Sequence, residues 1–216
     1  MTDRDIKWTA FAPASSSRQR EQTEWSIHYA YNVTETDKPR VLLIGDSICK
    51  GYESRVRDLL NGKVNVSFWA SSKCVTDPDY LRELDFMLDA RPYDMITFNN
   101  GLHSLFTDRE EWNAAYASAV SFIQAKLPDT KLSLVLSTPL TEEKLTKTVV
   151  SLNETVRNIA ADRNLPVLDL FSPMDALDRD RYWTDTFHYQ PEAVGMQAEL
   201  IASHCLSALL PENAPG

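Results

Sequence analysis

Five short apolar runs recur along the chain, and polar or helix-forming stretches separate them. The runs are rich in Val, Ile, Leu and Phe with little alternation of polar and apolar positions, which is typical of strands covered on both faces. We therefore predict strands at 40–45 (RVLLIG), 64–70 (VNVSFWA), 94–99 (DMITFN), 131–137 (KLSLVLS) and 165–171 (LPVLDLF).

The segments between the runs repeat apolar residues at three- and four-residue spacing, which indicates helices with one buried face. The predicted helices span 54–61, 79–90, 109–127, 147–164 and 191–210, the last with Pro191 in its first turn. Alternating strands and helices indicate a parallel sheet with right-handed crossovers. The predicted fold class is α/β, a three-layer α/β/α arrangement around a five-stranded parallel sheet.

Residues 1–39 do not follow this alternation. Within them, WSIHYAYNV (25–33) is a candidate edge strand, and the polar stretch before it is expected to be a surface extension. At 216 residues the chain is long enough for one sizeable core. We therefore predict a single domain over 40–216, preceded by an N-terminal extension over 1–39.

Composition and charge exclude several classes of partner. The chain is 43% hydrophobic and 25% charged, with a net charge of −9, so it lacks the basic surface that nucleic acid requires. No apolar run approaches the roughly 20 residues that cross a bilayer. The first twenty residues contain no apolar core of a signal peptide. We expect a soluble protein with no membrane insertion, cytoplasmic as it stands or exported if a leader was removed.

Cys49, Cys74 and Cys205 form no CxxC pair and have no His at metal-ligand spacing. This pattern favours buried free thiols, while a disulfide between Cys49 and Cys74 stays open because each follows an early strand. No metal and no cofactor is predicted.

Polar clusters follow four of the predicted elements. Ser47 follows the first strand, ASSKC (70–74) the second and NNGLH (99–103) the third, while WTDTFHYQ (183–190) precedes the last helix. Because functional residues of an open parallel sheet lie beyond the carboxyl ends of its strands, we expect these clusters to meet in one site.

The residue types in these clusters fit nucleophilic catalysis. A serine hydroxyl needs a base to remove its proton, and the base needs a carboxylate that holds its tautomer. Asp185 and His188 are three residues apart, so one turn can bring both toward Ser47. The oxyanion would be met by backbone N–H groups after the first two strands and an asparagine amide after the third. The alternatives are a helix-capping role for Ser47, a surface turn for Asp185 and His188, and turn chemistry for the asparagines.

GDSI (45–48) and DTFH (185–188) resemble motifs of the SGNH, or GDSL, hydrolases. The resemblance covers roughly residues 40 to 205 and implies a flavodoxin-like fold. It also implies that Ser47 is the nucleophile, that Asp185 and His188 complete its triad, and that a glycine and an asparagine in the middle motifs assist the oxyanion.

The two middle motifs depart from the family pattern. Ala70, Ser71 and Ser72 stand where a glycine is usual, and we take Ser71 as the donor there, beside the N–H of Ser47. NNGLH is similar to a variant NxGLH form, which favours Asn99 over Asn100 without excluding Asn100.

His103 and Trp183 are candidate substrate-binding residues, with a structural histidine and a packed aromatic as the alternatives. The resemblance implies a serine esterase that removes short acyl groups, acetyl above all, from carbohydrate or another small ester. A lysophospholipase or thioesterase, or a catalytically silent carbohydrate-binding relative, is the alternative. The oligomeric state is not predicted.

Overall fold

A six-stranded sheet in the order β1-β3-β2-β4-β5-β6 forms the middle layer of the computed structural model, which describes residues 6–13 and 16–210. Strands β2 to β6 run parallel, and β1 pairs antiparallel with β3 at one edge. The strands are β1 (Ser26–Ala30), β2 (Arg40–Gly45), β3 (Asn65–Ser71), β4 (Met95–Phe98), β5 (Lys131–Val135) and β6 (Val167–Leu168).

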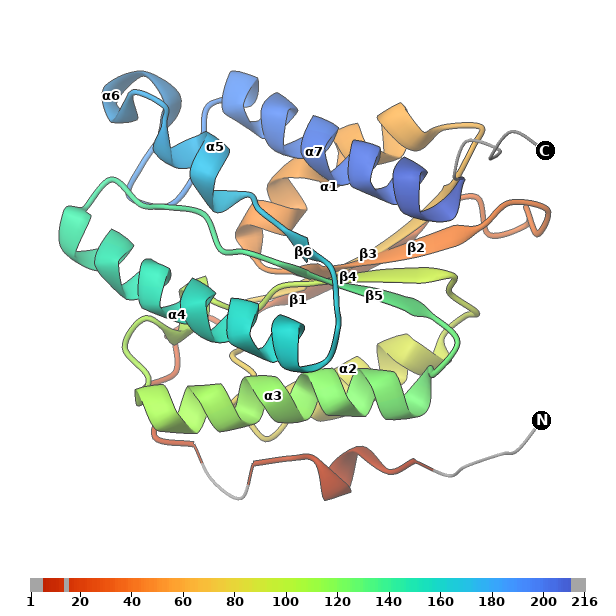
Figure 1. Cartoon of the computed structure of the whole chain (residues 1–216), viewed down its shortest axis with the longest axis horizontal. Coiled ribbons are helices and arrows are strands. Elements are labelled where there is room, and N and C mark those ends of the chain that lie inside the picture. Colours follow the sequence, from red (N-terminus) through yellow and green to blue (C-terminus); the bar gives the residue numbers. More distant parts are fainter. Residues whose placement is uncertain (1–5, 14–15, 211–216) are drawn as a thin grey trace.

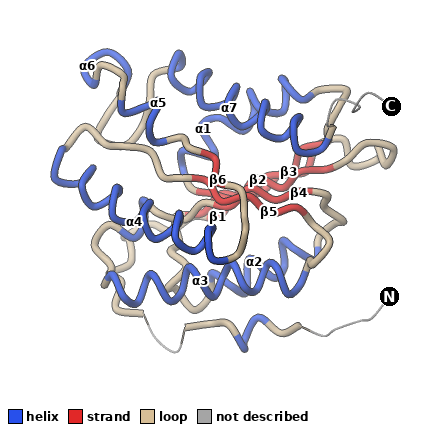
Figure 2. The backbone as a smooth tube through the Cα atoms, viewed as in Figure 1, coloured by secondary structure: helices blue, strands red, loops and turns tan. Residues whose placement is uncertain are grey.

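Helices cover both faces of the sheet (Figure 1). Helices α1 and α7 pack together on one face, and α2, α3 and α4 lie on the other; Figure 2 shows the strands enclosed between these two layers. The helices are α1 (Ser47–Leu60), α2 (Tyr80–Asp89), α3 (Arg109–Lys126), α4 (Glu143–Asp162), α5 (Phe171–Asp175), α6 (Arg179–Tyr182) and α7 (Pro191–Leu209), with 3-10 turns η1 (Trp8–Ala10) and η2 (Leu102–Ser104).

The predicted α/β class and three-layer arrangement are confirmed, and the parallel part of the sheet has the expected strands. Every residue of β2, β3 and β4 is buried, which explains why these strands have no polar alternation. The sheet also has a sixth strand, β1, which lies within the stretch 25–33. The order of the strands reverses at β2, so the carboxyl end of β2 is the expected place for a site.

Helix α1 and strand β6 differ from their predicted bounds for local reasons, and helix α4 begins four residues before its predicted start. Helix α1 begins at Ser47, because Asp46 caps it directly after β2. Strand β6 is shorter than predicted, because the Asp169 carboxylate accepts hydrogen bonds from the N–H groups of Phe171 and Ser172 and starts a helix there.

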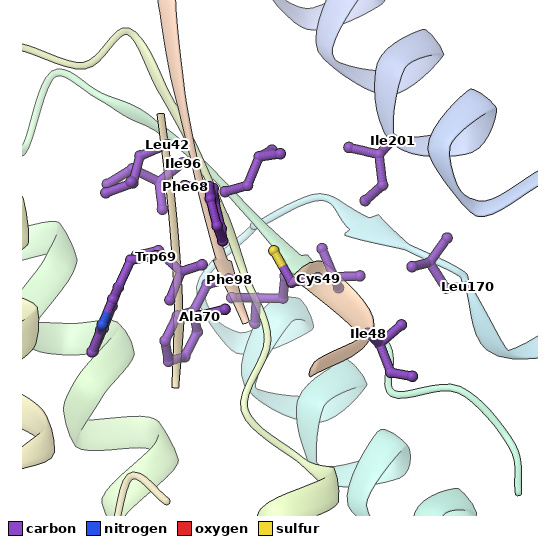
Figure 3. Packing of buried hydrophobic residues seen from close by; sticks show 14 of the residues in the cluster. Leu42, Ile48, Cys49, Phe68, Trp69, Ala70, Ile96, Phe98, Leu170 and Ile201 are labelled. Atoms are coloured by element: carbon purple, nitrogen blue, oxygen red, sulfur yellow. The ribbon is translucent and has the colours of Figure 1, made fainter. Parts of the chain in front are cut away.

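The core lies on both sides of the sheet. Figure 3 shows Ile48 and Cys49 of α1 among buried side chains of the strands and of α7. All three cysteines are buried and free, so no disulfide joins Cys49 to Cys74. Burial raises the pKa of each thiol, that of Cys205 to about 12. These thiols behave as small core side chains.

Residues 16–25, which we call the N-terminal segment, run from the side of α3 to β1. The N–H of Ser17 binds the carboxylate of Glu111, and the N–H of Trp25 binds Ser72 Oγ at 2.9 Å. The segment therefore crosses the loops that follow β3 and β4 before the chain enters the sheet. Within the described residues, no helix is both long and apolar enough to span a membrane.

Candidate active site

Ser47 lies at the junction of the central strand β2 and helix α1. The cap of the helix is Asp46, whose Oδ1 accepts a hydrogen bond from the N–H of Ile48 at 2.9 Å. Because Asp46 performs the capping, the half-buried Ser47 hydroxyl is left free for other partners. The N–H of Ser47 is the first of the helix, where N–H groups have no intrahelical acceptor and the helix dipole favours negative charge.

A continuous hydrogen-bonded chain links Ser47, His188 and Asp185. His188 Nε2 lies 2.9 Å from Ser47 Oγ, and His188 Nδ1 lies 2.9 Å from Asp185 Oδ2. The structure thus brings together three residues from two distant parts of the chain. This order of hydroxyl, imidazole and carboxylate is the arrangement in which a serine loses its proton to a histidine.

The turn between α6 and α7 holds Asp185 in place. Its Oδ1 accepts hydrogen bonds from the N–H groups of Phe187 at 2.8 Å and His188 at 2.9 Å. Burial alone would raise the pKa of Asp185, but these N–H groups and the imidazole outweigh it and lower the pKa. Asp185 is therefore a carboxylate at neutral pH and can hold the Nδ1–H tautomer of His188.

A pocket of about 580 Å³ opens in front of Ser47 and His188. Its walls combine aromatic and aliphatic side chains (Trp25, Leu102, Leu105, Phe106, Phe187) with polar groups (Arg18, Gln19, Glu21, Lys50, His103, Thr107). The pocket is large enough for a substrate of several carbon atoms rather than for an acetyl group alone.

The side-chain amides of both asparagines of the third motif hydrogen-bond neighbouring loops. Asn99 Nδ2 donates to the carbonyl of Val135 at 2.7 Å and to Ser137 Oγ at 3.1 Å. Asn100 Nδ2 donates to the carbonyl of Lys73 at 2.9 Å, and its Oδ1 accepts from the N–H of Val75 at 2.9 Å. Both amides join the loop after β4 to neighbouring loops, which is a structural use of the side chain.

Ser71 and Trp183 also lie outside the walls of this pocket. Ser71 is the last residue of β3, and its hydroxyl binds the carbonyl of Trp25 and the N–H of Lys73. Trp183 is buried against Tyr189, with ring centroids 4.4 Å apart, so its ring belongs to the packing beneath the Asp185 turn. From that loop, Phe187 reaches the pocket instead.

His103 does line the pocket, and its Nδ1 lies 2.5 Å from Glu21 Oε1. Glu21 and Trp25 belong to the N-terminal segment; the sequence predicts a surface extension for the stretch before residue 25 and places Trp25 in the candidate edge strand. The segment is polar and carries no motif, and only its tertiary contacts place it at the site. Among the described residues, no group of three or more His, Cys, Asp and Glu side chains is placed to hold a metal ion.

Several solved hydrolase structures are similar to the chain. A GDSL-like lipase from Bacteroides thetaiotaomicron is 18% identical, over 79% of this chain and 89% of that one, with a TM-score of 0.62. An acetylxylan esterase from Geobacillus stearothermophilus is 16% identical, over 81% and 95% respectively, with a TM-score of 0.63. A member of the lipolytic G-D-S-L family from Veillonella parvula is 17% identical, over 80% and 99%, with a TM-score of 0.64.

No protein-family model matches the chain, and no curated protein matches its sequence. The structural likeness therefore shows a shared fold, and the chemistry has to be argued from the site.

Proposed function

We propose that this chain is a serine ester hydrolase of the SGNH, or GDSL, type. The observation that carries the proposal is the hydrogen-bonded chain from Asp185 through His188 to Ser47 at the mouth of a pocket. The fold shared with GDSL-like lipase and acetylxylan esterase structures supports it.

In the proposed reaction, Ser47 Oγ attacks the ester carbonyl while His188 Nε2 takes its proton. His188 then gives that proton to the leaving alkoxide, so an alcohol departs and an acyl-enzyme remains. Water attacks the acyl-enzyme with the same base, releases the acid and returns the proton to Ser47. Asp185 stays ionised throughout and holds the imidazole.

The oxyanion needs donors aimed at it, and the N–H of Ser47 at the start of α1 is well placed for this. Asn99 Nδ2 donates to two acceptors, and the Asn100 amide holds Lys73 and Val75 of the loop after β3, so we assign this role to backbone N–H groups and a structural role to the asparagines.

Acetyl esters of carbohydrate are the proposed substrates. The acetylxylan esterase among the structural neighbours supports this choice, as does a pocket that combines aromatic rings with polar groups. The GDSL-like lipase among the neighbours favours a long-chain ester as the second candidate. Rates on acetyl and decanoyl 4-nitrophenyl esters separate the two, and a preference for decanoyl would exclude the first.

A fluorophosphonate probe tests the nucleophile directly. The folded chain should form one adduct, mapped to Ser47 by mass spectrometry, and Ser47→Ala should form none. Ser54→Ala, on the same helix, is the control and should label like the parent. Absence of an adduct in the folded parent would favour a silent carbohydrate-binding relative.

A further inference from the structure

The N-terminal segment is fixed to the rim of the pocket by a buried arginine. Arg18 is 8% exposed, and its guanidinium pairs with the fully buried carboxylate of Asp77. The same group donates to the carbonyl of Ser72 at 2.9 Å and to the carbonyl of His103 at 3.1 Å. Arg18 thus ties the segment to the loops after β3 and β4, and the segment forms one wall of the pocket.

Within this wall, Glu21 orients the ring of His103. Glu21 Oε1 binds Nδ1 at 2.5 Å, and Trp25 meets the ring edge-on, with centroids 6.2 Å apart and planes at 77°. The side chain of His103 is 16% exposed, and Nε2 has no hydrogen-bond partner among the described residues. With Nδ1 occupied, Nε2 is the nitrogen that remains for a ligand in the pocket.

A hydroxyl group matches Nε2 in either protonation state. A neutral ring that donates from Nδ1 to Glu21 accepts at Nε2, whereas a charged ring donates there, and a hydroxyl does both. A methylene group at the same place would leave a polar nitrogen without a partner, which costs free energy.

We propose that the N-terminal segment and His103 form a subsite for the alcohol half of the ester, and that Nε2 of His103 hydrogen-bonds a hydroxyl of a sugar. The inference rests on the proposed function. It adds that the polyhydroxy alcohol is recognised, and that a segment outside the predicted domain recognises it.

The other walls also offer surfaces that a sugar ring can satisfy. Trp25 and Phe187 offer flat apolar faces, and Phe106 stands 85% exposed at the rim. Lys50 Nζ lies 5.6 Å from the centre of the Trp25 ring, so a positive charge lies beside this aromatic surface. A sugar has apolar C–H faces and hydroxyl edges, which satisfy both kinds of surface, whereas an alkyl chain would desolvate the polar groups without replacing their water.

Three acetyl esters test the subsite: a monoacetylated methyl xyloside, cyclohexyl acetate, which keeps the ring and lacks the hydroxyls, and 4-nitrophenyl acetate. The parent should prefer the xyloside to cyclohexyl acetate. His103→Leu should lower kcat/KM for the xyloside by about 10- to 100-fold and for the other two esters by less than about twofold.

Glu21→Gln should act in the same direction, and His103→Gln, which keeps a hydrogen-bonding group, should recover part of the loss. His28→Leu, exposed on β1, is the matched control and should leave all three rates unchanged.

Equal losses of kcat/KM on all three esters would place His103 at the reacting centre and overturn the subsite. Unchanged kcat/KM on all three esters would also overturn it. Binding separates this inference from the proposed function. Ser47→Ala should bind the acetylated xyloside in an NMR titration, and adding His103→Leu should raise Kd about tenfold or more. Binding that depends on His103 with no hydrolysis by the parent would keep the subsite and reject the esterase. Binding that is indifferent to His103 would reject the subsite alone.

Discussion

The Asp185 carboxylate hydrogen-bonds two backbone N–H groups as well as the imidazole of His188. The two backbone N–H groups hold the carboxylate within the turn, and the same carboxylate orients the His188 ring. The turn between α6 and α7 and the candidate active site therefore depend on one side chain. The two tasks respond differently to substitution, because an amide oxygen still accepts from the backbone while an amide nitrogen cannot accept from Nδ1.

For this reason Asp185→Asn should keep the fold and lose the chemistry. We expect kcat to fall by about 10⁴, as in other triads where the imidazole is held in the wrong tautomer, with little change in the melting temperature. Steady-state kinetics and a thermal scan measure the two effects. A loss of tenfold or less would mean that another group orients His188.

Substitution of Asn99 or Asn100 should have the opposite result, a loss of stability with most of kcat retained. Asn99→Ala and Asn100→Ala should each destabilise the fold by about 1–3 kcal/mol, because buried carbonyl and N–H partners lose their hydrogen bonds. Neither should lower kcat of the folded protein by more than about tenfold, against the 10²–10³ expected of an oxyanion donor.

Urea unfolding and kcat below the unfolding transition measure the two effects. A hundredfold loss of kcat at unchanged stability would show that the substituted amide donates a hydrogen bond to the oxyanion.

The N-terminal segment is the element whose position depends most on one residue. Removing the charge of Arg18 leaves Asp77 buried without its partner, which typically costs about 3–5 kcal/mol. Arg18→Met should lower the free energy of unfolding by that amount, or else release the segment and speed its proteolysis at Arg20.

Arg20→Met is the control. Arg20 pairs with Asp79 and Glu24 at the surface and lies 3.9 Å from Asp77, with its side chain 46% exposed, so its loss should cost much less than that of Arg18, about 1 kcal/mol or less. Similar losses in the free energy of unfolding for the two substitutions, measured by urea unfolding, would contradict this role of Arg18.

Comparison of the helices and strands with their predicted bounds shows which parts of the structure can be predicted from the local sequence pattern. Strands β2, β3 and β4 lie close to their predicted bounds because burial on both faces requires continuous apolar runs. Ser47 is predictable because it directly follows the central strand, and Asp185 and His188 are predictable because their three-residue spacing lies in the turn just before the last helix. The placement of residues 16–25 is not readable, since it depends on Arg18 meeting Asp77 across the chain. The partners of Asn99 and Asn100 depend in the same way on which loops lie beside them.

At the scale of the whole molecule, His204 links stability to pH. It lies on α7 with Nε2 2.9 Å from Ser133 Oγ of β5, and burial lowers its pKa below the ordinary value of about 6.5. The unfolded chain then binds a proton more readily than the folded one, so stability from the neutral ring is complete above pH 6.5 and declines as the pH falls below it.

His204→Gln should remove this share of the pH dependence. Urea unfolding at pH 7.5 and pH 5.5 should show a smaller drop in the free energy of unfolding for His204→Gln than for the parent. His28→Gln, on exposed β1, should keep the drop of the parent. An identical drop in all three proteins would show that His204 does not contribute.

The contact between Ser47 and His188 joins positions that are 141 residues apart. Arg18, in the wall of the pocket, pairs with Asp77, which follows it by only 59 residues. During synthesis, the nucleophile therefore leaves the ribosome long before its base does. The pocket wall can close while the second half of the chain is still being made, but no nascent chain that ends before residue 188 can activate the serine. Probe labelling of ribosome-bound chains of increasing length would thus show when the active site is completed, with reactivity appearing only after the turn before α7 has emerged.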